Sequence, residues 1–172
     1  MRILITYFSN TGNTEKVAKS MKEGLTDYEV DLLPVKEVDP TTLSSYNIVF
    51  IGSGVYASRI DKSVLNLIKK AAPHLPTKLV YFCTHASLNM YQDAFNKVNT
   101  LIQEYNCEVV GEFDCVGENL GLPEETQLAM LEKLPDEQKE KAIKIREENK
   151  GRPNEKDLSN AKNFALTLVK NL

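Results

Sequence analysis

The sequence predicts an α/β fold: a doubly wound, five-stranded parallel sheet with helices on both faces. Five short apolar segments alternate with segments whose apolar residues recur at helical spacing, as expected for alternating strands and helices. The apolar segments are nearly continuous, which is typical of strands that helices cover on both sides. A chain of 172 residues is long enough for a substantial core, and we expect one domain spanning residues 1–172.

The first strand is predicted at Ile3–Phe8, and the following helix has an apolar face formed by Val17, Ala18, Met21 and Leu25. The loop between them is rich in hydroxyl and amide groups and comprises Ser9, Asn10, Thr11, Gly12, Asn13 and Thr14. A helix begins with amides that lack intrahelical partners, and its dipole adds positive potential there. This strand, loop and helix start therefore predict a phosphate-binding site.

An ordinary turn with a helix cap is the alternative interpretation of this loop, because the same residue types favour both. The loop has no acidic residue, and Gly12 permits a backbone conformation that brings the chain close to a ligand. The sequence has neither the Gly-Lys-Ser/Thr run of a triphosphate loop nor the three spaced glycines of a dinucleotide loop. A terminal phosphate monoester therefore fits better than a triphosphate or a pyrophosphate.

The second and third strands are predicted at Val30–Leu33 and Ile48–Ile51, joined by a polar connection with room for one or two helical turns. After the third strand comes a glycine-containing segment that includes Ser53, Gly54, Val55, Tyr56 and Ala57. Its glycines allow a flat ring to lie against the backbone, and Tyr56 offers an aromatic plane for stacking. The alternative is a glycine-rich turn with a surface tyrosine.

The next helix is predicted from the spacing of Val64, Leu65, Ile68, Ala71 and Ala72, and the fourth strand at Leu79–Cys83. Residues 84–89 follow this strand and reach the same edge of the sheet, with Thr84, His85 and Ala86 as candidate ring contacts. A solvated histidine is the favoured interpretation of His85, because a lone histidine in a loop is usually exposed. The helix that follows has an apolar face of Tyr91, Ala94, Phe95, Val98, Leu101, Ile102 and Tyr105.

The fifth strand is predicted at Glu108–Cys115, and the last helix from Leu158, Ala161, Phe164, Ala165, Leu168 and Leu172. Residues 118–121 open onto the same sheet edge, and we interpret them as a polar turn. An insert at about residues 124–152 is dense in mixed charge and contains two apolar stretches separated by Pro135, which predicts two short helices. The insert is either a solvated appendage or a cap over the site.

The loop at residues 9–14 resembles the phosphate loop of flavodoxins, whose Thr/Ser-x-Thr-Gly-x-Thr pattern it matches. The resemblance covers most of the chain and weakens over residues 124–152. It implies a flavodoxin-like sheet of order 2-1-3-4-5, for which flavodoxin is itself the reference example, with FMN at the crevice between strands 1 and 3. It also implies that the phosphate lies in this loop, and that a backbone carbonyl near Gly54 and Val55 accepts a hydrogen bond from the half-reduced ring.

The resemblance implies a protein that carries electrons through non-covalently bound FMN, with redox partner proteins or a small-molecule electron acceptor as its partners. Such a carrier needs no catalytic acid or base of its own. A charged His85 beside the ring would raise the potential of the reduced flavin. The alternative is a flavodoxin-like oxidoreductase of the protoporphyrinogen oxidase or quinone reductase type, with the insert as a lid. The mixed charge of the insert speaks against a membrane surface.

Two further classes are less favoured. A phospho-receiver module needs acidic residues at the ends of the first and third strands, where this chain has Ser9-Asn10 and Gly52-Ser53. A flavin-free interaction module is the remaining alternative. The two hydroxyl- and glycine-bearing strand ends favour a bound cofactor over both.

Composition excludes several other classes. A net charge of −3 argues against a nucleic-acid partner, and no apolar run is long enough to span a membrane. Cytoplasmic residence is the default expectation. Cys83, Cys107 and Cys115 are odd in number and form no C-x-x-C pair, so neither a disulfide nor a metal site is expected. A redox centre would therefore be an organic cofactor.

Overall fold

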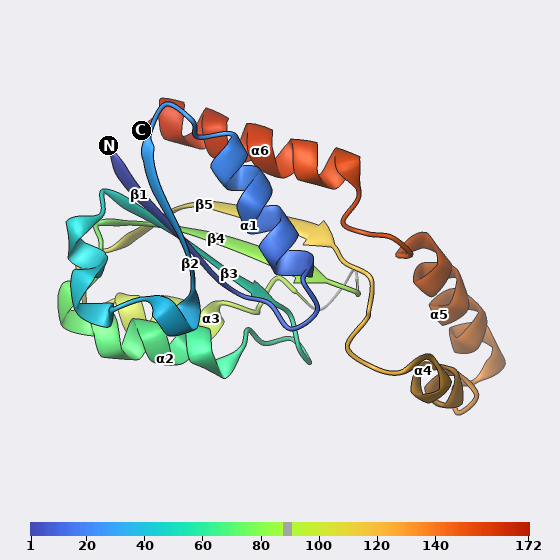
Figure 1. Ribbon diagram of the computed structural model, residues 1–172. Coiled ribbons are helices and arrows are strands. Elements are labelled where there is room, and N and C mark those ends of the chain that lie inside the picture. The colour runs from blue at the N-terminus through green and yellow to red at the C-terminus, as the bar shows by residue number, and fades with distance from the viewer. Residues whose placement is uncertain (88–90) are drawn as a thin grey trace.

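The computed structural model, which describes residues 1–87 and 91–172, contains a five-stranded parallel sheet of order β2-β1-β3-β4-β5 (Figure 1). This confirms the predicted fold class and strand order. The strands are β1 (Arg2–Phe8), β2 (Glu29–Pro34), β3 (Ile48–Gly54), β4 (Lys78–His85) and β5 (Glu108–Val116). Because all five run in the same direction, their carboxyl ends meet at one edge of the sheet.

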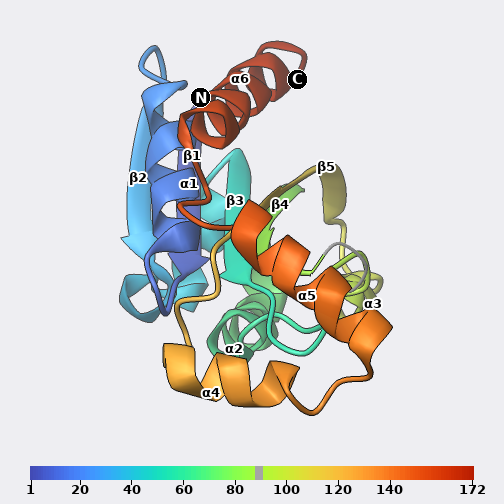
Figure 2. The ribbon, with the colours of Figure 1, turned by 90° about the vertical axis from the view of Figure 1, so that its right-hand side faces the viewer.

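Helices cover both faces of the sheet, as Figures 1 and 2 show. Helices α1 (Asn13–Glu23) and α6 (Glu155–Lys170) lie on one face, and α2 (Lys62–Ala71) and α3 (Asn96–Ile102) on the other. Alternate residues of each strand face opposite helix layers, so Ile3 and Ile5 pack with α1 while Leu4 packs with α2. Two apolar cores therefore hold the sheet between them.

The connections between the layers are short. Two 3₁₀ turns, η1 (Val35–Glu37) and η2 (Pro40–Ser45), join β2 to β3, which confirms the predicted short connection. A third, η3 (Ala72–His74), follows α2. Asp39 begins η2 by accepting a hydrogen bond from the Thr41 N–H.

Strands β3 and β4 run further than predicted. Gly54 pairs with Thr84, and His85 pairs with Val116, so backbone pairing continues through the segments that the sequence assigned to loops. Gly52 lies inside β3 and does not end it. Glycine is needed there because the Phe82 ring packs against it, and a Cβ would come within 2.1 Å of that ring. The predicted site segments at residues 53–57 and 84–86 therefore begin inside β3 and β4.

Helix α3 is shorter than predicted. It begins at Asn96, and residues 91–95 form turns instead, with Ala94 N–H donating to the Tyr91 carbonyl. Tyr91 leaves the helical path because its ring stacks on His85, with centroids 3.9 Å apart. Tyr105 lies beyond the helix end and is 40% exposed, so its placement on the apolar face was wrong. Residues 88–90, at the end of the predicted segment 84–89, lie outside the described residues.

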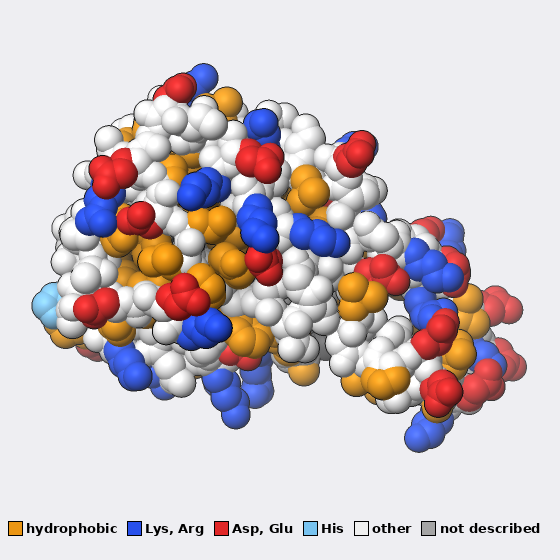
Figure 3. Space-filling view, in the orientation of Figure 1, with side chains coloured by type: hydrophobic (Ala, Val, Ile, Leu, Met, Phe, Trp, Pro, Cys, Tyr) orange, Lys and Arg blue, Asp and Glu red, His pale blue; other side chains and the backbone are white. Residues whose placement is uncertain are grey.

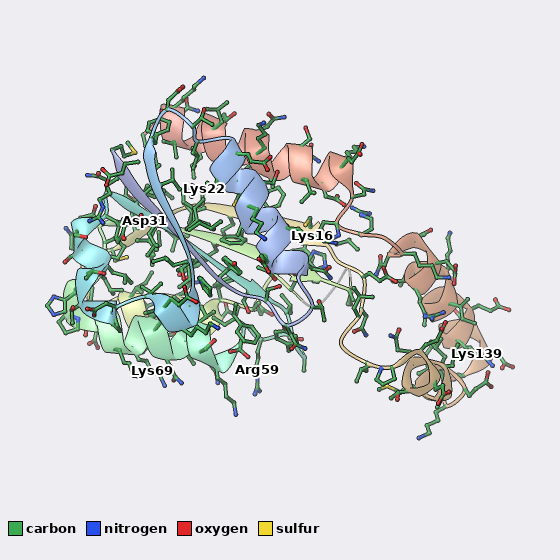
Figure 4. The ribbon with its side chains drawn as sticks, viewed as in Figure 1. Lys16, Lys22, Asp31, Arg59, Lys69 and Lys139 are labelled. Atoms are coloured by element: carbon green, nitrogen blue, oxygen red, sulfur yellow. The ribbon has the colours of Figure 1, made fainter. Side chains whose placement is uncertain are left out.

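The insert forms two helices, α4 (Glu124–Leu131) and α5 (Asp136–Glu148), as predicted. They stand beyond the carboxyl edge of the sheet, away from both helix layers (Figure 1). Neither helix contains a buried residue. An ion pair of 2.7 Å between Lys139 Nζ and Glu132 Oε1 links α5 to the end of α4 (Figure 4 labels Lys139).

Candidate cofactor site

A cavity of about 380 Å³ opens at the carboxyl edge of the sheet. It brings together residues from the ends of β1, β3 and β4 with the segment after β5. The predicted residues that line it are Ser9, Asn10, Thr11, Asn13, Thr14, Gly54, Val55, Tyr56, Ala57, Thr84, His85 and Ala86. Gly12 and Ser53 are not among the lining residues. The loops predicted from three separate stretches of sequence therefore surround one space.

Gly12 sets the geometry of the loop after β1. Its φ of +90° is left-handed, and a Cβ at this position would meet nothing within 4 Å, so the backbone angle rather than space requires glycine. The Gly12 N–H donates to Ser9 Oγ over 3.1 Å, which closes the loop. Gly12 also precedes α1 without a side chain to cap it. The first amides of α1 therefore keep their capacity to bind an anion.

The two polar side chains at the start of α1 are buried. Thr14 Oγ1 lies 2.9 Å from Thr84 Oγ1, which ties the helix start to the end of β4. Asn13 Nδ2 donates to the Glu118 carbonyl over 2.8 Å. Asn13 Oδ1 is buried without a hydrogen-bond partner among the described residues. These contacts hold the loop against the segments after β4 and β5.

The buried side chain of Ser53 holds the segment after β3 in place through two hydrogen bonds. Its side chain is fully buried, and its Oγ donates to the Gly54 carbonyl over 2.7 Å and accepts from the Asp61 N–H over 2.9 Å. The chain then reverses in a tight turn in which Tyr56 and Arg59 exchange backbone hydrogen bonds of 2.8 and 3.1 Å. The Ser53 hydroxyl therefore fixes the backbone on which Tyr56 is carried.

The ring of Tyr56 lies over Gly54 at the mouth of the cavity. A Cβ at Gly54 would come within 2.7 Å of the Tyr56 hydroxyl oxygen, so glycine is needed for this close approach. The ring also meets Phe8 edge to face, with centroids 6.2 Å apart. Burial raises the pKa of the Tyr56 phenol, although a hydrogen bond from the Asn10 backbone opposes this. Tyr56 thereby spans the mouth from the β3 side to the loop after β1.

His85 is buried at the end of β4 rather than solvated, so the favoured interpretation of this residue was wrong. Its Nδ1 lies 2.8 Å from the Ser87 carbonyl oxygen, and its Nε2 lies 2.9 Å from Asp114 Oδ2. The stacked Tyr91 ring covers one face of the imidazole. A carboxylate, a carbonyl and a ring therefore fix its orientation beside the cavity.

The segment after β5 also lines the cavity, contrary to its interpretation as a polar turn. The lining residues that the predicted site did not include are Gly117, Glu118, Asn119, Leu120, Gly121 and Leu122. Gly117 approaches α1 so closely that a Cβ there would lie 2.7 Å from Asn13 Nδ2. The available signal was position alone, because the segment follows a parallel strand and so reaches the same edge as the other loops.

The chemistry of the lining is that of a site for an anionic group attached to a flat ring. Among the described lining residues, no lysine or arginine is present, and Glu118 is the one carboxylate. Backbone amides and hydroxyls therefore supply the donors for an anion. The three cysteines are free thiols, and burial raises the pKa of Cys115 to about 12. The described residues contain no group of side chains suited to a metal ion.

The strand order defines a doubly wound α/β protein, with an uncapped helix start and a cavity at the carboxyl edge of its sheet. Comparison with known families matches residues 4–166 to the flavodoxin domain. The chain therefore belongs to the flavodoxin domain family. Membership implies a flavin cofactor, and the residues that surround the cavity fit one.

Two relatives match nearly the whole chain. An uncharacterised protein of Methanocaldococcus jannaschii is 27% identical over 174 residues, which cover 99% of this chain and all of that protein. BilS of Clostridioides difficile, a flavodoxin-like domain-containing protein, is 26% identical over 98% of this chain and 97% of its own length. Full-length similarity to both includes the insert region.

Solved structures show the same fold. An archaeal flavodoxin superimposes with a TM-score of 0.67 at 13% identity, covering 99% of this chain and 98% of that protein. Flavodoxin 2 of Bacillus cereus gives a TM-score of 0.66 at 18% identity, with both chains fully covered. Of the described part of the present chain, no helix is long and apolar enough to cross a membrane.

Proposed function

We propose that this protein binds FMN without a covalent bond and carries electrons between redox partners. The observation that carries the proposal is the uncapped start of α1 behind Gly12, in a cavity whose described lining has no lysine or arginine. A phosphate monoester would be held by the first amides of α1 and by the hydroxyls of Ser9, Thr11 and Thr14. Bound FMN supplies one- and two-electron redox chemistry that side chains lack.

The remaining residues orient and tune the ring. Tyr56 offers its aromatic face, and Gly54 and Val55 offer backbone groups at the cavity wall. A carboxylate near the ring disfavours a negatively charged reduced ring, and the first acidic residues after β3, β4 and β5 are Asp61, Asp93 and Glu118. Of these, Glu118 lines the cavity, whereas Asp61 caps α2 and Asp93 accepts from Asn96. The position of Glu118 therefore supports a role for its carboxylate in setting the redox potential of the flavin.

The cofactor itself provides the first test. Purified protein should be yellow, and the flavin released by denaturation should be FMN rather than FAD. A colourless protein that also fails to take up added FMN would contradict the proposal.

The phosphate loop is tested by comparing two ligands that differ only in the phosphate. Thr11→Ala and Thr14→Ala should each weaken FMN by about tenfold or more and leave riboflavin nearly unchanged, because a hydrogen bond to a charged group contributes about 1.5–3 kcal/mol. Fluorescence quenching of each flavin measures both affinities. Thr14→Ser keeps the hydroxyl and should bind FMN about as tightly as wild type. Equal losses of affinity for the two ligands would contradict the assignment of the phosphate to this loop.

A further inference from the structure

A second cavity of about 690 Å³ lies between the insert and the loops of the cofactor site. It adjoins the first cavity, because five residues line both: Ala86, Glu118, Asn119, Leu120 and Leu122. Its volume falls within the range of small-molecule sites, about 300–1,000 Å³. A molecule in this space would therefore lie beside the proposed flavin.

The walls of the second cavity are largely apolar. Leu120 and Leu122 come from the segment after β5, and the insert contributes Met130, Leu131, Ala142 and Ile145. Met130 is 56% exposed and Leu120 is 54% exposed, so large apolar side chains face the space without cover from the described chain. Figure 3 shows hydrophobic side chains among the charges of the insert. Exposed apolar surface in a concave site favours a bound apolar ligand.

The charged residues of the lining are balanced and paired. Arg146 Nη2 lies 2.6 Å from Glu124 Oε1, and Lys150 Nζ lies 2.8 Å from Glu147 Oε2. Glu118 Oε2 accepts from the Gly151 N–H over 2.8 Å. These pairs leave no charge that requires a counterion, although guanidinium and ammonium groups keep further N–H donors. An uncharged ligand with carbonyl acceptors at its edge matches this arrangement.

The insert is anchored to the cofactor loops, so its wall has a defined position. Asn149, which is 7% exposed, donates from Nδ2 to the Ala86 carbonyl over 2.8 Å. Gln127 Nε2 donates to the carbonyls of Asn119 and Leu122, each over 2.8 Å. Both anchors end on segments that line the two cavities. The wall of the second cavity is therefore built onto the loops of the first.

We propose that the second cavity binds a small, uncharged, largely apolar molecule with edge carbonyls, of the quinone class, beside the cofactor. Its position next to a flavin rests on the proposed function, whereas binding itself rests on the cavity. A partner protein is the other class of occupant for exposed apolar surface. The small molecule is favoured because one chain supplies apolar residues on both sides of a space of ligand size.

The test uses FMN-loaded protein and 2-methyl-1,4-naphthoquinone, with binding measured by isothermal titration. Leu131→Asp and Ile145→Asp place a charge in the lining. Leu128→Asp and Ile143→Asp are matched controls on the same helices, because both residues are exposed and lie outside the lining. The lining variants should bind the quinone about tenfold or more weakly, and the controls should stay within about twofold of wild type. Flavin absorbance checks that all four variants retain FMN.

Two results would overturn the proposal. One is that the wild-type protein fails to bind the naphthoquinone up to the solubility limit of the quinone. A partner protein would then be the favoured occupant of the apolar surface. The other is an equal loss in lining and control variants. Repeating the titration without FMN separates this proposal from the previous one: quinone binding by a protein that fails to load FMN would still support the second cavity.

Discussion

At the scale of single residues, the cofactor site depends on backbone positions that only glycine adopts easily. Gly12 and Gly151 both have left-handed φ angles, +90° and +71°, and a Cβ at either would meet nothing within 4 Å. Substitution therefore introduces backbone strain without a clash. The two residues form a matched pair, because Gly12 lies in the proposed phosphate loop and Gly151 lies at the base of the insert.

Gly12→Ala and Gly151→Ala should each lower the free energy of unfolding by about 1–2 kcal/mol, the cost of a left-handed conformation for a residue with a side chain. Only Gly12→Ala should also weaken FMN binding, because it shifts the amides at the start of α1. Urea denaturation and flavin titration measure the two effects. Equal effects on FMN would mean that the loop geometry is not specific to binding.

The residue scale also shows how far the sequence predicts the site. The loop at residues 9–14 was recognisable because its residues are adjacent and its chemistry is local. His85 was misjudged because its partner Asp114 lies on a different strand, and a contact between distant residues leaves no local pattern. Glu118 was undervalued for the same reason, since its carbonyl meets Asn13 across 105 residues.

At the scale of elements, α6 has the most fully specified start in the described chain. Asn154 caps the helix by accepting from the N–H groups of Lys156 and Asp157, and Asp157 accepts in return from the Asn154 N–H. Arg152 adds a two-pronged ion pair to Asp157, at 2.7 and 2.5 Å. Burial acts to raise the pKa of Asp157, but the hydrogen bonds from Arg152 and Asn154 outweigh it, so the pKa is lowered.

A carboxylate with a lowered pKa in the folded state stabilises the protein above its unfolded pKa, about 3.9, and loses this contribution as pH falls through the folded value. Asp157→Asn should therefore lower the free energy of unfolding by about 1–3 kcal/mol at pH 7. The difference from wild type should shrink below about pH 4.

Glu155→Gln is the control, because Glu155 is an exposed acid in the same helical turn. Denaturant unfolding across pH 3 to 7 gives the comparison. A difference between wild type and Asp157→Asn that does not depend on pH would contradict the assigned role of the carboxylate.

Element boundaries show why periodicity predicts helices better than it predicts their ends. The apolar spacing from Tyr91 to Tyr105 is helical throughout, yet α3 covers only Asn96–Ile102. Stacking of Tyr91 on His85 competes with helix formation, and the helix therefore begins only at Asn96. By contrast, the break at Pro135 is local chemistry, and the sequence placed the division between α4 and α5 correctly.

At the scale of the whole molecule, the helices of the insert lie outside the lining of the cofactor cavity. None of its helical residues lines the first cavity, and neither α4 nor α5 has a buried residue. The sequence predicted two helices here but not their position. That position depends on Gln127 and Asn149 meeting backbone carbonyls of other segments, which composition does not reveal.

Replacing residues 124–148 with a short Gly/Ser linker should therefore leave the protein folded and able to bind FMN, while removing naphthoquinone binding. Circular dichroism and flavin absorbance monitor the first two properties, and titration monitors the third. Loss of FMN together with the insert would show that the hydrogen bonds of Gln127 to the segment after β5 are essential to the cofactor cavity.

The contact of Asn13 with the Glu118 carbonyl has a consequence for the timing of maturation. A nascent chain leaving the ribosome presents its phosphate loop almost at once, but the opposite wall is still untranslated. The cavity is complete only after the fifth strand has emerged and docked. A cofactor bound as proposed would therefore be captured late in biogenesis, after β5 has joined the sheet.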